Sequence, residues 1–436
     1  MTLVSTFVDL VQQVSAVMTQ PTFQSFLIVL SGWVFTRRRT VTGMILAADA
    51  VGTKHHSAFH RLFAAARWSL DELGLAMFRL MLAWLDEEAV MLALDDTLAR
   101  KRGLKVYGVG MHHDPLLSTR KTAIMNWGHS WVVLGVIVRL PFAPDQCFCL
   151  PILFRLYLSK QTAAKKGGPY RKRSQLAVEM LQVLCTAYEH RRFHVIADSA
   201  YGGKTVYLNL PKNCDLTSRL DLDARLYEAP PVRGPGTNGR PRKRGQRLPT
   251  PRQMLQDRAR RVTLNIYGRK DRSRVVDQVA YLYAMPDGPV RVVAVEPLTG
   301  GRTTQAFFST CTEASAEEVL TWYAMRWSIE TMFHDSKGQL GFEEPQGWTK
   351  RAVERTAPTA MLLYSLIVLW FASAAHRLYR APNRPWYRSK SRPSFADMLA
   401  TLRQETVQEK VSALRPTGRG SRNLVKTLLH AVKHAA

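Results

Sequence analysis

The first 88 residues have the apolar spacing of helices. Apolar residues recur three and four positions apart in "FQSFLIVLSGWVF", residues 23–35, and again in "LDELGLAMFRLMLAWLDEE", residues 70–88. This spacing places them on one side of a helix with 3.6 residues per turn. The pattern therefore predicts an all-helical unit over residues 1–88.

Between these two helices the pattern predicts a helix-turn-helix. Thr40 can cap a short helix that ends near Ala50, Gly52 supplies a turn, and Ser57 begins a second helix that runs through Ala66. A helical bundle with basic surface residues is the alternative interpretation. The basic side chains that could contact phosphates or base edges are Arg37, Arg38, Arg39, Lys54, His60 and Arg61.

From residue 90 the pattern changes to strands. Three apolar runs, "VMLALDDT", "HSWVVLGVIVRL" and "FCLPILFRLYL", precede an amphipathic helix, "SQLAVEMLQVLCTAYEH", and a further buried strand, "FHVIADSAY". Three strands, a helix and another strand indicate an α/β layer fold with a mixed sheet.

Residues 228–310 interrupt this order. A stretch rich in Pro, Gly and Arg, "APPVRGPGTNGRPRKRGQRLPTPRQ", has no periodicity and is typical of a mobile loop. It carries the candidate DNA-binding residues Arg242, Lys243 and Arg244. Strand-like runs then return in "QVAYLYAMP", "VRVVAVEPL" and "QAFFST".

We therefore divide the chain into four parts. We expect residues 1–88 to form a helical, helix-turn-helix-like domain, and residues 89–227 with 311–376 to form the α/β core. Residues 228–310 are the Arg/Pro-rich loop and β-rich insertion. Residues 377–436 are a basic tail, which we expect to be extended before a last short helix.

The charge of the chain points to a polyanionic partner. Sixty-one Lys and Arg against 34 Asp and Glu leave a formal charge of +27. Such an excess opposes compaction unless a partner neutralises it. Nucleic acid is the leading candidate, and an anionic membrane surface is the alternative.

Other features favour a cytoplasmic protein that does not bind a membrane. The five cysteines are odd in number and contain no C-x-x-C pair, so a disulfide framework is not indicated. The N-terminus has no basic segment and carries Asp9 within its apolar run, which is unlike a signal peptide. The apolar run "AMLLYSLIVLWFASAA", residues 360–375, is shorter than a typical membrane span, and we interpret it as a buried core helix.

Two of the predicted strands end in aspartate. Asp95 and Asp96 close "LALDDT", and Asp198 follows "VIA". If these strands are neighbours, the carboxylates converge, and a divalent metal would relieve their repulsion. Oxygen ligands without a His or Cys cluster favour Mg²⁺ or Mn²⁺ over zinc. With Glu330 as a third carboxylate, the set suits two-metal phosphoryl transfer.

The segment "YAMRWSIETMFHDSKG", residues 323–338, is predicted to be one helix that carries functional groups on one face. Tyr323, Arg326, Glu330 and Lys337 follow one another at spacings of three, four and seven. Arg326 and Lys337 could bind phosphates, and Tyr323 could stack or donate a hydrogen bond. A solvated salt bridge between Arg326 and Glu330 is the alternative.

The spacing Y-(2)-R-(3)-E-(6)-K resembles the signature of a large insertion-sequence group of bacterial DDE transposases. The surrounding blocks are similar too: "LDDT", "IADSAYGG", "YAMRWSIETMFHDSKGQLGFEEPQ" and, in the N-terminal region, "RRRTVTGM". The similarity covers residues 20–375.

The resemblance implies an RNase H-like mixed-sheet core with a β-rich insertion, preceded by a helical DNA-binding domain. It implies binding of the inverted-repeat ends of a mobile element, their cleavage, and joining of the 3′-OH ends to target DNA, by cut-and-paste. It also implies two Mg²⁺ ions, replaceable by Mn²⁺, and a homodimer or higher multimer on double-stranded DNA in the bacterial nucleoid.

Site residues carry over from the same resemblance. The metal ligands would be Asp96, Asp198 and Glu330, and the residues at the DNA end would be Tyr323, Arg326, Trp327 and Lys337. Asp95 and Asp96 point to opposite faces of a strand. We favour Asp96 because Thr97 follows it, as in the family block.

One departure from the family concerns the insertion. Some relatives flip a base onto a tryptophan there while they form a hairpin intermediate, but residues 228–321 contain no Trp. Tyr267, Tyr281 and Tyr283 could substitute, although strand-core roles fit them better. Hairpin formation and direct hydrolysis of both strands both stay open. A retired DNA-binding protein derived from a transposase and a nuclease without strand transfer are the alternative functions.

Overall fold

The structure is a computed structural model of the 436-residue chain. It describes residues 2–85, 88–119, 121–232, 242–266, 269–299, 303–379, 390 and 392–413.

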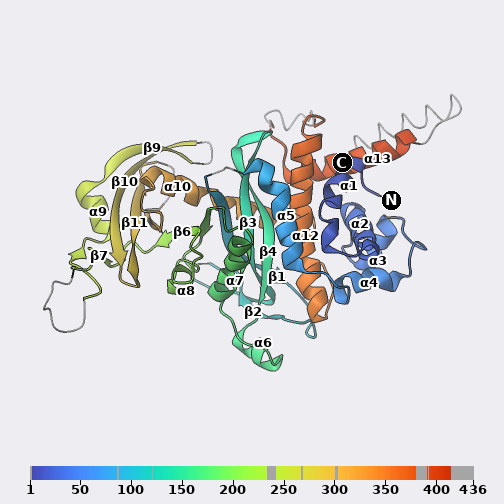
Figure 1. Ribbon diagram of the computed structural model, residues 1–436, viewed down its shortest axis with the longest axis horizontal. Coiled ribbons are helices and arrows are strands. Elements are labelled where there is room, and N and C mark those ends of the chain that lie inside the picture. Colours follow the sequence, from blue (N-terminus) through green and yellow to red (C-terminus); the bar gives the residue numbers. More distant parts are fainter. Residues whose placement is uncertain are drawn as a thin grey trace.

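A mixed sheet of 12 strands runs through the molecule (Figure 1). Its order is β2-β3-β1-β5-β6-β12-β11-β10-β7-β8, while β4 pairs with β3 and β9 pairs with β10. Strand β5 is parallel to both β1 and β6, and the other pairs are antiparallel. The core strands are β1 (Val90–Arg100), β2 (Gly110–His113), β3 (Met125–Leu140), β4 (Ala143–Tyr157), β5 (Phe193–Ala197) and β6 (Cys214–Leu220).

The remaining strands extend the core sheet beyond β6, and all of them except β7 lie within the insertion. They are β7 (Leu226–Tyr227), β8 (Arg247–Leu248), β9 (Arg260–Ile266), β10 (Arg269–Leu282), β11 (Met285–Pro297) and β12 (Gln305–Ser309). The insertion also contains helix α9 (Pro251–Arg258). The prediction of an RNase H-like mixed sheet with a β-rich insertion is confirmed.

Helices cover the core sheet, and the α-helices of residues 5–64 lie beyond the long helix of residues 350–370 in Figure 1, whereas the helix of residues 70–81 packs on β4. In chain order the N-terminal helices are α1 (Ser5–Gln12), η1 (Ser15–Val17), α2 (Gln20–Phe35), α3 (Val41–Ala47), α4 (His56–Ala64), α5 (Leu70–Met81) and η2 (Leu82–Trp84). The later helices are α6 (Lys160–Lys165), α7 (Arg173–Ala187), α8 (Lys204–Tyr207), α10 (Ala316–Met325), α11 (Trp327–Gly338), α12 (Lys350–Trp370), the π-helix η3 (Phe371–Ala375) and α13 (Phe395–Ala413).

Two short helices, α3 and α4, lie where the helix-turn-helix was predicted. The Thr40 side chain caps α3 by accepting a hydrogen bond from the Gly43 amide, 3.0 Å away. Helix α4 begins at His56, one residue before the predicted Ser57, and ends at Ala64 and not at Ala66; the ring of His55 accepts a hydrogen bond from the Ser57 amide. Binding of DNA by this helix pair stays a prediction.

Gly32 allows α2 and α3 to approach closely. A Cβ atom at Gly32 would lie 1.9 Å from the backbone oxygen of Met44. We expect Gly32→Ala to lower the free energy of unfolding by about 1–3 kcal/mol, because the two helices must separate. Urea unfolding measures this. Gly168→Ala is the control, because a Cβ there meets no atom within 4 Å; equal effects of the two substitutions would contradict the prediction.

Helix α12 is the core helix that the sequence predicted. Residues Lys350–Ala375 are long and apolar enough to cross a membrane, but 89% of the most apolar window is buried inside the protein. Both faces are covered, by β4 on one side and by α1 and α4 on the other (Figure 1). The length and hydropathy of this helix are therefore explained by its central position.

The tail differs from the expected extended segment. Its described part contains α13, a 19-residue helix whose Phe395, Met398 and Leu402 are buried. The Ser394 backbone N–H donates to the Asp397 carboxylate at the start of the helix, 2.7 Å away. The tail as a whole is rich in basic residues, but residues 395–413 contain only two of them against three acids, and their apolar spacing is that of a helix. Residues 414–436, where we expected the last short helix, lie outside the described residues.

Candidate active site

The pairing of β1 with β5 brings Asp95 and Asp198 to the same level of the sheet. These strands are parallel, and Leu94 pairs with Ala197, so each aspartate comes directly after a paired residue. The sequence predicted that this strand ends at Asp95 and Asp96, but β1 continues to Arg100 along β3. The predicted convergence of the two strands is present nevertheless.

Asp95 faces helix α11 and meets Glu330 through Arg326. One guanidinium nitrogen of Arg326 donates to Asp95 Oδ2 at 2.6 Å, and the other donates to Glu330 Oε1 at 2.7 Å. The side chains of Arg326 and Asp95 are only 13% and 17% exposed. Asp198 is close enough to act on the charges of both Asp95 and Arg326. Asp95 and Glu330, which are remote in sequence, therefore share one largely buried guanidinium, and Asp198 is near enough to act on its charge.

Asp96 points to the opposite face of β1. Its Oδ1 accepts a hydrogen bond from the Tyr201 hydroxyl at 2.8 Å, and its Oδ2 lies 3.3 Å from Arg173 Nε. The guanidinium of Arg173 also stacks 4.2 Å from the ring centre of Tyr157. The contacts to α11 and Glu330 are thus made by Asp95 and not by Asp96.

The cluster around Asp95 carries an unbalanced negative charge. Burial, followed by the charges of Asp96 and Asp198, raises the pKa of Asp95 to about 7, although Arg326 acts in the opposite direction. The pKa of Arg326 is raised despite its burial, because Asp95, Tyr323 and Glu330 favour its charged form. Among the charged groups that act on Asp95, two carboxylates therefore stand against one guanidinium.

Comparison with known families agrees with this geometry. The sequence profile of the family described as DDE superfamily endonuclease matches residues 13–275, which is more than half of the chain. The chain belongs to this family. The match includes Asp95, Asp96 and Asp198 but ends before Glu330. None of the curated proteins searched matches the sequence.

A DDE endonuclease acts on DNA and uses divalent metal ions. The donors of this site, all carboxylate oxygens, fit a hard divalent ion. Among the described residues, however, no three His, Cys, Asp or Glu side chains are spaced to hold an ion in this conformation. In this conformation Arg326 bridges Asp95 and Glu330.

The segment predicted as one catalytic helix consists of two helices in this DDE endonuclease. Helix α10 ends at Met325 and α11 begins at Trp327, with Arg326 between them. Hydrogen bonds here span three residues, from the Arg326 amide to the Tyr323 oxygen and from the Ile329 amide to the Arg326 oxygen. Tyr323 therefore belongs to α10, and its ring packs 4.4 Å from Phe307. The same ring lies 5.6 Å from the Arg326 guanidinium.

Lys337 and Trp327 lie outside the carboxylate cluster. Lys337 donates to the backbone oxygen of Leu98 on β1 at 2.8 Å and is 3.8 Å from Glu343. Lys337 thus ties the end of α11 to the strand that carries Asp95. Trp327 is 53% exposed and lines a cavity of about 580 Å³ between α11, β9 and the β3–β4 hairpin.

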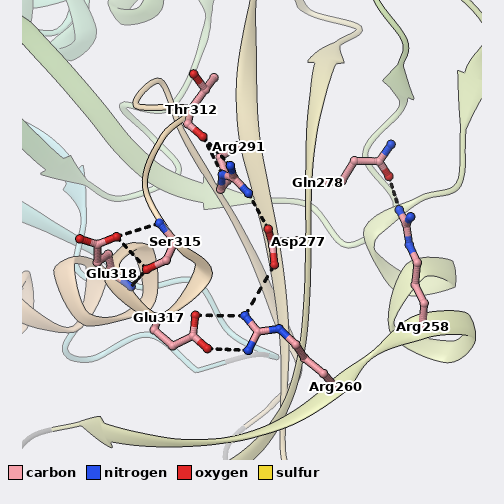
Figure 2. A network of polar contacts seen from close by, with 9 residues as sticks. All are labelled: Arg258, Arg260, Asp277, Gln278, Arg291, Thr312, Ser315, Glu317 and Glu318. Carbon is pink, nitrogen blue, oxygen red and sulfur yellow. Dashed lines mark hydrogen bonds and ion pairs between the residues drawn. The ribbon is translucent and has the colours of Figure 1, made fainter.

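The insertion holds α10 in place through an ionic network (Figure 2). Arg260 donates to both carboxylate oxygens of Glu317 on α10, at 2.6 and 3.0 Å, and lies 3.8 Å from Asp277 on β10. Arg291 joins Asp277 to the backbone oxygen of Thr312, just before α10. The position of Arg326 at the end of α10 is therefore linked to the β-rich insertion.

Three of the candidate DNA-binding residues already contact other parts of the same chain. Arg39 bonds to Glu344 and to the backbone oxygen of Gln339, and Lys54 donates to the backbone of α2. Arg244 stacks 3.9 Å from the ring centre of Tyr283. The remaining candidates are exposed: Arg37, Arg38, His60, Arg61, Arg242 and Lys243.

Two residues near the site were not selected from the sequence. Tyr201 and Arg173 both contact Asp96. Tyr201 lies in the "IADSAYGG" block, where its proximity to Asp198 was a usable signal, whereas Arg173 lies in a basic stretch with no distinguishing feature. Of the tyrosines considered as base-stacking residues, Tyr267 lies outside the described residues.

Proposed function

We propose that this DDE endonuclease is a transposase of the insertion-sequence group with the Y-(2)-R-(3)-E-(6)-K signature. It binds the inverted-repeat ends of its element, cleaves them and joins the 3′-OH ends to target DNA, by cut-and-paste. One observation carries this proposal: Asp95, Asp198 and Glu330, drawn from two parallel strands and a helix, gather around Arg326.

In this proposal Asp95, Asp198 and Glu330 hold the divalent ions, Mg²⁺ or in its place Mn²⁺. The ions would activate the attacking hydroxyl and stabilise charge on the leaving oxygen. We assign the first ligand to Asp95 and not to Asp96, because Asp95 shares Arg326 with Glu330. Asp96 is a positioning residue that bonds Tyr201 and Arg173.

Arg326 changes partners when the site is loaded. Its planar fork, which bridges two carboxylates in this structure, is the group best suited to a phosphate of the DNA end. Tyr323, stacked beside it, contacts the same strand, and Trp327 lines the neighbouring cavity. Lys337 positions β1 against α11.

The wider functional setting belongs to the same proposal. The helical N-terminal domain and the exposed basic residues of the insertion contact the duplex, and a homodimer or larger assembly holds two ends together. The protein works on the nucleoid in the bacterial cytoplasm.

Incubation with the DNA that flanks its own gene tests this function. With Mg²⁺ we expect breaks at the inverted-repeat ends and joined products, and with EDTA we expect binding alone. Sequencing of the ends also distinguishes hairpin formation from direct hydrolysis. Binding without breaks in Mg²⁺ would identify a retired DNA-binding protein. Breaks without joining, even from pre-cut ends, would identify a nuclease.

A further inference from the structure

A second cavity, of about 340 Å³, lies at the junction of the N-terminal helices and the catalytic sheet. None of Asp95, Asp198 and Glu330 lines it. Its walls come from the starts of α5 and α12, the end of β4 and the residues before α7. Four arginines line the cavity against two acids, Asp71 and Glu354; the arginines are Arg155, Arg171, Arg351 and Arg355.

Protein groups already hold three of these arginines. Arg155 makes a two-fold contact with Asp71 at 2.7 and 2.8 Å, and Arg171 pairs with Glu179. Arg355 donates to backbone oxygens, among them Ala66 at 2.7 Å, and stacks 4.4 Å from the ring of Trp68. These contacts fix the guanidinium groups in place around the cavity.

Arg351 differs from the other three. It is exposed, and within the described part of the chain it has no hydrogen bond or ion pair. Its charge acts against a neighbour, because burial and then the charge of Arg351 lower the pKa of Arg355. The cavity is therefore short of negative charge beside Arg351.

Two further features favour an anion in this place. Lys350 and Arg351 occupy the first turn of α12, where the helix dipole is positive and cations are unfavourable. Thr349 provides no side-chain cap for the backbone amides there. Trp131, which is 1% exposed and lines the cavity, has an indole N–H without a partner in the described structure.

We propose that this cavity binds a backbone phosphate of duplex DNA, with Arg351 as the main contact. The surroundings favour nucleic acid as the source of the phosphate. Residues 160–173, which include Arg171, contain six Lys and Arg and no acid. Lys350, next to Arg351 in the chain, is exposed as well. The inference rests on the proposed function only in that DNA is the substrate. It adds a phosphate contact outside the catalytic cluster.

Duplex binding in EDTA tests the inference. Fluorescence anisotropy with a labelled duplex of the element end, over a series of salt concentrations, compares wild type with Arg351→Ala. We expect the variant to bind about tenfold more weakly at low salt, with the log–log salt slope reduced by about one unit. Lys212→Ala is the matched control, because Lys212 is also exposed but precedes β6 at the opposite end of the sheet from Asp198.

Interference by phosphate ethylation locates the contact. Wild type should show one ethylation-sensitive phosphate that becomes insensitive in Arg351→Ala and stays sensitive in Lys212→Ala. Unchanged affinity, slope and interference in Arg351→Ala would overturn the inference. So would binding of inorganic pyrophosphate that depends on Arg351 while duplex binding does not.

The two proposals fail in different ways. If wild type binds the duplex through Arg351 but never cleaves it with Mg²⁺, the transposase function fails and the phosphate site stands. If wild type cleaves and joins ends while Arg351→Ala binds as tightly as wild type, the phosphate site fails and the function stands. If wild type binds no duplex, both fail. Because Arg351 has no protein partner in the described structure, the variant should unfold at the wild-type temperature.

Discussion

Asp95→Asn is expected to reduce Mg²⁺-dependent cleavage by about 10³-fold or more, whereas Asp96→Asn should reduce it by about ten- to a hundredfold at most. Loss of a metal ligand removes several kcal/mol of charge stabilisation, and each 1.36 kcal/mol changes the rate tenfold. Loss of a positioning contact, as in Asp96→Asn, reduces the rate by a smaller factor. Single-turnover cleavage of pre-bound element ends measures both rates.

Binding of the ends in EDTA provides the control for this comparison. Both variants keep the size of the side chain, so end binding should stay close to wild type. Glu330→Gln is the reference for complete loss of cleavage, because Glu330 is a proposed metal ligand that shares Arg326 with Asp95. An inactive Asp96→Asn beside an active Asp95→Asn would return the ligand role to Asp96, as the sequence analysis predicted.

The choice between Asp95 and Asp96 shows where sequence analysis reaches its limit. The block "LDDT" located the strand, and the apolar run "FHVIA" located its partner, so the convergence on Asp198 could be predicted. Adjacent residues of a strand face opposite sides. Helix α11 packs on one face of β1, and α7, which packs on β3 and β4, reaches Asp96 on the other face through Arg173. Asp95 and Asp96 are both half-buried, so burial does not mark the catalytic face.

The same limit applies to the basic residues of the N-terminal region. Arg39 pairs with Glu344, 305 positions away in the chain, and nothing in the local sequence indicates this. Arg37 and Arg38, in the same run of arginines, are exposed. Local pattern predicts the helices, because their apolar spacing is local, but the availability of a charged side chain depends on long-range contacts.

Arg326→Ala is expected to lower the free energy of unfolding by about 3 kcal/mol in EDTA. The substitution leaves Asp95 and Glu330 without their shared cation, and breaking a buried ion pair from one side is strongly destabilising. Urea unfolding in EDTA measures the change. Arg326→Lys keeps the charge but cannot bridge two carboxylates with a planar fork, so its stability should be intermediate.

A divalent ion should stabilise Arg326→Ala more than wild type. Without the guanidinium, the carboxylates are free to bind Mg²⁺, and a ligand that binds only the folded state raises its stability. The double variant Arg326→Ala/Asp95→Asn should regain part of the lost stability in EDTA, because one uncompensated carboxylate is gone, and should respond less to Mg²⁺. If Arg326→Ala is as stable as wild type in EDTA, or gains nothing from Mg²⁺, then the guanidinium does not stand in place of a metal ion.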